Sequence, residues 1–285
     1  MSVEILITGG SRQTAAMVRL LLGFCLVVSA LAESALVEGH KVHYSSYGKG
    51  HKTLVLVHGW TCDETFWASN VPGLSKQYRV LTVDLPGHGQ SVPAPEYSMD
   101  AFADAVSAVM TEAKVKRATL VGHSMGGPVL LAFARRHREQ VTALVAVDAA
   151  FSDPKSAARS QAKGRSFLGP DALTAREAIV RHMFSTATLP ATREHILRVM
   201  LAVPEQVADG AIQGMRDPEF WREDRIDLPF LEIAAGSSAY ITLPALRGRF
   251  PLAQIKRIRG TGHFLMMEKP LVFNRTLLAW LAARH

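Results

Sequence analysis

Short apolar runs alternate with segments of helical periodicity along most of this 285-residue chain, and this alternation restricts its possible folds more than any other feature. Continuous apolar runs bounded by turns are typical of strands that are buried on both faces of a parallel sheet. The expected strands and helices are Val42–Tyr47, Thr53–Val57, Val80–Val83, Ala118–Val121, Leu144–Val147, Phe230–Ala234 and Gln254–Ile258, and Asp100–Ala113, Pro128–His137 and Leu271–Ala283. The pattern predicts an α/β fold with a mostly parallel, doubly wound sheet.

Residues 151–225 interrupt this alternation. Their periodicity is helical and is broken at Gly169-Pro170, Pro190 and Pro204. An interval of this length is too long for an unstructured loop. We therefore expect a helical cap over the carboxyl edge of the sheet, where open α/β sheets bind ligands. The core then comprises residues 33–150 and 226–285.

Residues 1–32 are expected to lie outside this fold. Arg19 precedes an apolar run over residues 20–28, and small residues follow up to Ala32. This order is typical of a secretory signal peptide cleaved near Ala32, and the run is shorter than the roughly 20 residues of a membrane span. Translation from Met17 would leave an upstream extension. The sequence favours a secreted or periplasmic protein without stable membrane insertion after cleavage; an uncleaved anchor and a cytoplasmic protein with a buried N-terminal helix are the alternatives.

The net charge of +7 raises the question of a nucleic-acid partner. Residues 240–285 contain eight Lys and Arg against one Glu, so they carry the whole surplus. These charges are scattered through an amphipathic pattern and are not interleaved with aromatic residues as in a single-strand binder. We interpret them as a solvated basic face and predict no nucleic-acid partner. The two cysteines, Cys25 and Cys62, form no CxxC pair, and no metal or cofactor is predicted.

The segment Gly122–Gly126 has the pattern G-x-S-x-G between a predicted strand and a predicted helix. A nucleophile at the tip of a strained turn needs small neighbours, which the two glycines supply. The turn exposes the Ser124 hydroxyl near the N-terminus of the following helix, where the Met125 amide can donate to a developing oxyanion. A second donor is expected at Trp60, because the apolar strand before it ends in His58-Gly59.

A histidine on a loop after the last predicted strand is the candidate base. Small residues precede it in Gly260-Thr261-Gly262-His263, and they allow His263 to lean over the sheet edge toward Ser124. An imidazole in that place can take the serine proton during nucleophilic attack.

Four segments in this order resemble the α/β-hydrolase superfamily: LVHGW (56–60), DLPGHGQS (84–91), GHSMGG (122–127) and GTGHF (260–264). The resemblance covers the chain from about residue 37 to the C-terminus. It implies that Ser124 is the nucleophile, that His263 is the base, and that the amides of Trp60 and Met125 bind the oxyanion. It also implies that the helical insertion after the sixth strand of the α/β-hydrolase fold is the family's cap.

The triad acid departs from the usual family pattern. In most relatives the acid follows the seventh strand, a few residues after a glycine, and Ser238 or Ala239 stands there in this chain. No Asp or Glu occurs from Ile233 to Met267. A base needs a partner that fixes its tautomer and stabilises the imidazolium, so the acid must come from elsewhere or be absent.

Asp148 is the candidate acid, because it directly follows the predicted strand Leu144–Val147. Some branches of the superfamily, including certain haloalkane dehalogenases, place their acid at the end of this strand. From there a carboxylate can approach the imidazole from a neighbouring strand. Asp153, Glu232 and a dyad without an acid are the alternatives.

We therefore predict a serine hydrolase, specifically a carboxylesterase that acts on small to medium esters through an acyl-enzyme. Esters are the default substrates because an alkoxide leaves more easily than an amine. Hydrolysis of lactones, thioesters or C–C bonds is an alternative. A non-catalytic binding module is another, because the usual acid is missing. The expected partner is a small ester-like molecule, and no oligomeric state is predicted.

Overall fold

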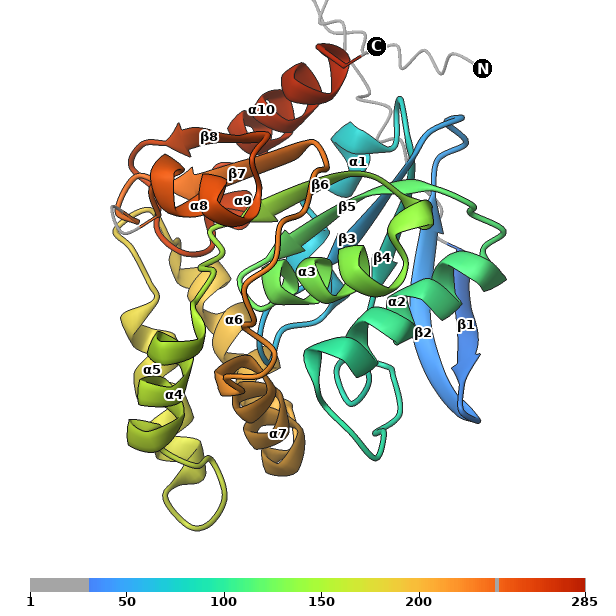
Figure 1. Cartoon of the computed structure of the whole chain (residues 1–285). Coiled ribbons are helices and arrows are strands. Elements are labelled where there is room, and N and C mark those ends of the chain that lie inside the picture. The colour runs from blue at the N-terminus through green and yellow to red at the C-terminus, as the bar shows by residue number, and fades with distance from the viewer. Residues whose placement is uncertain (1–30, 239–240, 285) are drawn as a thin grey trace, which may run out of the picture.

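The computed structural model describes residues 31–238 and 241–284, which form an eight-stranded sheet with helices on both faces (Figure 1). The strand order is β1-β2-β4-β3-β5-β6-β7-β8. The strands are β1 (Leu31–Val37), β2 (His40–Tyr47), β3 (Thr53–Val57), β4 (Arg79–Val83), β5 (Ala118–His123), β6 (Val141–Val147), β7 (Phe230–Ala235) and β8 (Ala253–Ile258). Strands β4, β3 and β5–β8 are mutually parallel, whereas β2 pairs antiparallel with both β1 and β4. The predicted α/β fold with a mostly parallel sheet is confirmed.

The inner parallel strands are buried because most of their residues are apolar on both faces, whereas the edge strand β8 is largely exposed. All five residues of β3 and all six of β5 are buried. Helices α2 (Met99–Glu112) and α3 (Gly126–Arg136) pack against each other, and α1 (Val71–Leu74) packs against α10 (Pro270–Ala282). Two helix layers thus enclose the apolar sheet, as expected of a doubly wound fold.

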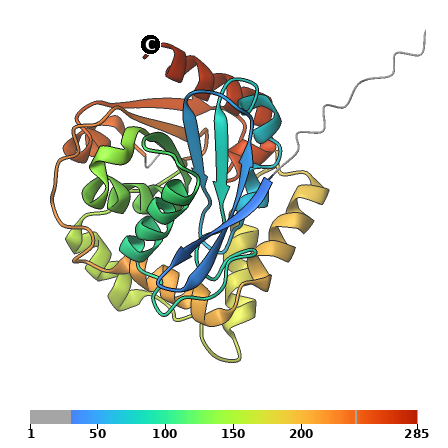
Figure 2. The ribbon, with the colours of Figure 1, turned by 90° about the vertical axis from the view of Figure 1, so that its right-hand side faces the viewer.

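Four helices lie between β6 and β7, and we refer to residues 151–225 as the cap. They are α4 (Pro154–Lys163), α5 (Ala172–His182), α6 (Pro190–Ala202) and α7 (Glu205–Arg216). In Figure 1 they gather below the sheet, and Figure 2 shows the same layer from the side. The Trp60 indole, on the loop after β3, donates to the carbonyl of Ala208 on α7 at 2.8 Å. The cap therefore lies against a loop at the carboxyl end of the parallel strands.

Short helices complete the core around these layers. They are α8 (Leu243–Arg249), α9 (Leu265–Glu268) and the 3-10 turns Glu64–Trp67 and Arg138–Gln140. Helix α9 begins two residues after His263, so it helps to define the loop that carries this histidine.

The edge of the sheet differs from the sequence expectation. Strand β1 begins at Leu31 and pairs with β2 along its length, so the sheet starts inside the segment expected to be removed as a signal peptide. The remainder of that segment, residues 1–30, lies outside the described residues. Within the described residues, no helix combines the length and apolarity needed to span a bilayer.

Candidate active site

Ser124 lies at a sharp turn between β5 and α3. Its φ of +51° is in the left-handed region, which a non-glycine residue rarely adopts. The turn is held laterally, because the Ser124 amide donates to the Val147 carbonyl at the end of β6 over 2.9 Å. Ser124 is partly exposed although its neighbours on both sides are buried. A strained turn that exposes one serine is the geometry expected of a nucleophile.

The glycines around Ser124 are required by close backbone approach. A Cβ on Gly126 would lie 2.7 Å from the Val57 carbonyl oxygen, and one on Gly122 would collide with the Gly126 carbonyl. A Cβ on Gly59 would lie 3.1 Å from the Ser124 Cβ. The backbone of Gly59 therefore lies directly against the side chains of His123 and Ser124, and the backbone of Gly126 lies directly against that of Val57.

The amides of Trp60 and Met125 border this contact. Met125 directly precedes α3, and Trp60 follows Gly59. Among the described residues, neither amide donates a hydrogen bond to a protein oxygen. Both donors are thus available to an oxygen bound at the serine turn.

His263 follows β8, and its backbone and ring are both anchored. Its Nδ1 lies 2.8 Å from Asp148 Oδ2, and its carbonyl accepts a hydrogen bond of 2.9 Å from His123 Nε2. The rings of His263 and His123 are 4.7 Å apart between centroids, and His123 directly precedes Ser124. Within residues 31–238 and 241–284, the Ser124 hydroxyl has no hydrogen-bond partner, so the structure pairs the imidazole with Asp148 and leaves the serine oxygen free.

Asp148 lies at the end of β6, next to the serine turn in the sheet, since His123 and Val147 are register partners. Its side chain is 1% exposed, and its φ of +47° marks a second strained corner. Oδ1 accepts from the Ala235 amide at 2.8 Å. Burial acts to raise the pKa of Asp148, but hydrogen bonds from His263, Ala235 and Ser238 outweigh it and lower that pKa. Asp148 is therefore held as a carboxylate facing His263.

The sequence did not predict that Ser238 and Glu232 lie next to Asp148. Ser238, one of the two residues at the position where relatives carry the acid, is buried, and its side chain helps to lower the pKa of Asp148. Glu232 is fully buried, and its Oε1 accepts from the Ala149 amide at 3.1 Å. Burial raises the pKa of Glu232 well above its ordinary value, because desolvation disfavours the charged form. Neither contact has a local sequence signal. Asp153, the remaining acid candidate, caps α4 at the surface. Ala239, the other residue at the position where relatives carry the acid, lies outside the described residues.

Two buried histidines near the site, His58 and His123, form hydrogen bonds with backbone groups. His58 Nδ1 donates to the Gly59 carbonyl at 2.8 Å, and its Nε2 accepts from the Leu85 amide at 3.0 Å. Burial lowers the pKa of His58 to about 4. Burial also lowers the pKa of His123, whose Nε2 donates a hydrogen bond to the His263 carbonyl. Both rings are neutral at pH 7, which leaves His263 as the histidine that faces a carboxylate at the serine turn.

One cluster of possible metal ligands occurs in the described part of the chain, formed by His43, Glu64 and Asp84. Its oxygens already accept protein hydrogen bonds. Glu64 accepts from the hydroxyls of Ser45 and Thr82, and Asp84 accepts from the backbone amides of Glu64 and Gln90. A metal ion would have to displace these donors, so the cluster fits a hydrogen-bonded brace for the loop after β4.

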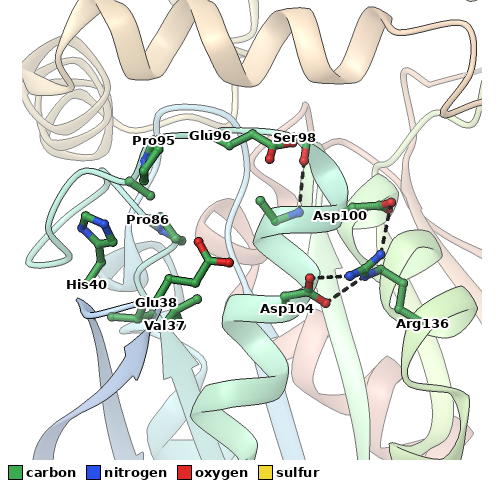
Figure 3. Close-up of a pocket in the computed structure, with 13 residues that line it drawn as sticks. Val37, Glu38, His40, Pro86, Pro95, Glu96, Ser98, Asp100, Asp104 and Arg136 are labelled. Carbon is green, nitrogen blue, oxygen red and sulfur yellow. Dashed lines mark hydrogen bonds and ion pairs between the residues drawn. The ribbon is translucent and has the colours of Figure 1, made fainter.

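A separate pocket of about 380 Å³ lies between the β1–β2 turn, the loop after β4 and the start of α2 (Figure 3). Figure 3 shows Asp100 and Asp104 turned toward Arg136, at 3.7 and 2.6 Å. The residues that line this pocket include none of the predicted catalytic or oxyanion residues.

Comparisons with known proteins agree with this fold. Residues 52–175 match the family profile described as alpha/beta hydrolase fold. The solved structure of Est816, described as an N-acyl homoserine lactone degrading enzyme, superposes with a TM-score of 0.71 at 26% identity, over 87% of this chain and 99% of that one. With the serine turn and the sheet order, these matches identify the chain as a member of the α/β-hydrolase superfamily.

Curated relatives carry different names. The dihydrolipoyllysine-residue acetyltransferase component of the acetoin cleaving system of Pseudomonas putida is 30% identical over 247 residues, 82% of this chain and 64% of that protein. The chain thus spans less than two thirds of that relative's length. The pimeloyl-(acyl-carrier protein) methyl ester esterase of Proteus mirabilis is 26% identical over 260 residues, 84% of this chain and 96% of that one.

Proposed function

We propose that this protein is a serine hydrolase that cleaves carboxylic esters through an acyl-enzyme. The observation that carries the proposal is the contact of 2.8 Å between His263 Nδ1 and the buried Asp148 carboxylate, beside the strained turn of Ser124. Membership of the superfamily and the esterase name of one relative support hydrolysis in general. The assignment of Ser124, His263 and Asp148 to a triad is our own.

In the proposed first step, Asp148 holds the Nδ1 proton of His263, which leaves Nε2 as the acceptor. His263 takes the hydroxyl proton of Ser124 as the serine oxygen attacks the acyl carbon. The carbonyl oxygen becomes an oxyanion that accepts hydrogen bonds from the amides of Trp60 and Met125. The C–O bond of the ester then breaks, and the leaving alkoxide takes the proton from His263.

In the second step, a water molecule gives a proton to His263 and attacks the acyl-enzyme. The new tetrahedral oxyanion uses the same two amides, and its collapse releases the carboxylic acid and returns the proton to Ser124. No cofactor or metal takes part in this scheme.

Aromatic side chains around His263 support a low-dielectric site, in which fixed donors act more strongly than in water. Phe264 packs against the His263 ring at 5.5 Å between centroids. Phe66 from the core and Phe184 from the cap pack against Phe264 at 5.9 and 6.3 Å. We expect this cluster to favour an apolar acyl or alcohol group in the substrate.

The test is hydrolysis of p-nitrophenyl acetate, butyrate and octanoate and of an N-acyl homoserine lactone, with fluorophosphonate labelling in parallel. Ser124→Ala should lower kcat by about 10⁶-fold and abolish labelling, because the nucleophile is lost. Ser160→Ala, which alters an exposed serine of α4, is the matched control and should leave both unchanged. A wild-type protein that neither turns over any substrate nor reacts with the probe would overturn the proposal.

A further inference from the structure

Glu268, the last residue of α9, joins the histidine loop to the cap. Its Oε2 accepts from the Gly262 amide at 2.6 Å. Its Oε1 accepts from the Ser185 hydroxyl at 2.8 Å and from the Thr188 hydroxyl at 2.5 Å. Gly262 directly precedes His263, whereas Ser185 and Thr188 belong to the linker between α5 and α6. One carboxylate thus bridges two segments that are about 80 residues apart in sequence.

Hydrogen bonds within the linker orient the hydroxyl groups of Ser185 and Thr188 toward Glu268. The Ser185 hydroxyl oxygen accepts from the Ala187 amide at 3.0 Å, and the Thr188 hydroxyl oxygen accepts from the Ser185 amide at 2.9 Å. Arg193 fixes the same linker by donating to the carbonyls of Thr188 and Ser185 at 2.8 and 3.0 Å. Each hydroxyl oxygen thus accepts from a backbone amide, and its proton points to the carboxylate, which is closer than the 3.5 Å that separates the two hydroxyl oxygens.

The cap and the histidine loop are in close contact at this point. A Cβ on Gly262 would lie 2.7 Å from the Cβ of Ser185, and Thr188 is 2% exposed. The loop therefore accommodates the docked linker only because residue 262 is glycine. Departure of the linker would uncover Gly262 and remove two of the three donors to Glu268.

The backbone is held on both sides of His263, at its own carbonyl and at the amide of Gly262, one peptide group before it. His123 donates to its carbonyl at 2.9 Å, and Glu268 holds the amide of the residue before it. The first contact lies wholly within the core, whereas the second depends on a side chain that also binds the cap. The orientation of the imidazole is thus tied to the position of the α5–α6 linker.

We propose that Glu268 is a positioning residue that couples docking of the cap linker to the alignment of His263. This inference rests on the proposed hydrolase function for its catalytic consequence. With the linker docked, three donors fix the carboxylate, and the carboxylate fixes the Gly262 amide. With the linker displaced, the histidine loop loses its tether and His263 loses its alignment with Ser124. Full activity then requires a closed cap.

The main test variant removes the cap half of the bridge and leaves the Gly262 hydrogen bond in place. In Ser185→Ala/Thr188→Val the two hydroxyl donors are lost, and both replacements fit the same volume. We expect kcat and the rate of fluorophosphonate labelling to fall about tenfold, since small misplacements of a catalytic group have effects of this order or larger. A contact that merely holds the cap would change KM or the melting temperature and leave kcat unchanged, which would overturn the proposal.

Non-additivity provides the second readout. Glu268→Ala should lower kcat at least as much, and adding the two linker substitutions to it should cause no further loss, because both act through one carboxylate. Independent effects that multiply would contradict the coupling. Glu268→Gln keeps an oxygen for the Gly262 amide but turns an NH₂ group toward two hydroxyls that donate, so it should lower kcat about as much as the linker double variant. Glu177→Gln, which alters an exposed carboxylate of α5 that pairs with Arg181, is the control.

Hydrogen exchange separates this inference from the proposed function, because it requires no turnover. The peptide covering residues 259–268 should exchange faster in the linker double variant than in the wild type, with no change in Glu177→Gln. Unchanged exchange in the double variant would overturn the coupling even in an active esterase. Faster exchange in a protein without esterase activity would support the coupling and count against the proposed reaction alone.

Discussion

Replacing Asp148 by Asn probes the proposed triad acid with almost no change in shape. In the native protein, Oδ1 accepts from the Ala235 amide at 2.8 Å, and Oδ2 faces His263 Nδ1 at 2.8 Å. Asn has one acceptor oxygen, and the buried Ala235 amide requires it, because an unsatisfied buried donor costs about 1–3 kcal/mol. The amide NH₂ of Asn must therefore face His263.

This orientation fixes the wrong tautomer of the base. An NH₂ group that donates to Nδ1 leaves the proton on Nε2, and the imidazole can no longer accept the proton of Ser124. A triad with its tautomer reversed loses about 10⁴-fold in kcat. At about 1.36 kcal/mol per tenfold change, the loss corresponds to about 5 kcal/mol of transition-state stabilisation. Stability should change little by comparison, because the Ala235 hydrogen bond is kept.

The assay is kcat for p-nitrophenyl butyrate, with ¹⁵N NMR of the His263 ring to report the tautomer and urea unfolding to report stability. Asp153→Asn is the matched control, since Asp153 caps α4 at the surface and Asn caps equally well. Activity of Asp148→Asn within tenfold of the wild type, in a folded protein, would refute the argument and return the acid role to another group.

Three further predictions follow from burial and packing. Glu232→Gln should leave kcat within about threefold, because burial raises the pKa of this carboxyl by disfavouring its charged form, and Gln preserves the acceptor for the Ala149 amide; a large loss would make Glu232 part of the triad. Gly126→Ala should abolish activity and lower the melting temperature, since its Cβ would lie 2.7 Å from the Val57 carbonyl, whereas Gly248→Ala on α8 meets nothing within 4 Å and should stabilise the fold by about 0.5–1 kcal/mol in urea unfolding. Burial raises the pKa of Asp84 from 3.8 to about 6, so the native state binds more protons than the unfolded chain in this window. The unfolding free energy should therefore fall by at most about 3 kcal/mol as the pH rises from 4 to 7, and Asp84→Asn should flatten that slope.

The strands and the serine turn could be predicted because their signals are local. The apolar run before Gly122 and the glycines around Ser124 lie within a few residues of one another, and the physics of a tight turn needs nothing else. Strand β1 was missed because its segment, LAESALV, alternates weakly and gains its place by pairing with β2. Its burial is also slight, since Leu36 is 66% exposed.

The acid required a different kind of reasoning. Asp148 was singled out because the segment after the seventh strand has no carboxylate, an inference from absence and resemblance, with no pattern of its own. The structure brings Asp148 and His263 to 2.8 Å, although the catalytic role of this pair stays a prediction. The effect of Ser238 on the pKa of Asp148 and the bridge through Glu268 had no signal at all, because each joins segments distant in sequence through a single side chain.

The position of Asp148 has a consequence for how rigid the site must be. The turns of Ser124 and Asp148 leave adjacent parallel strands, and each has a positive φ. Both corners are fixed by backbone hydrogen bonds to the next strand along the sheet, Ser124 to Val147 and Asp148 to Ile233. Nucleophile and acid therefore move with the sheet, whereas His263 stands on a loop held by side chains. Among the three proposed triad residues, only the base has a place that the cap can alter, so control of the triad by the cap has to act through His263. The cap also contacts Trp60, whose amide is a proposed oxyanion donor.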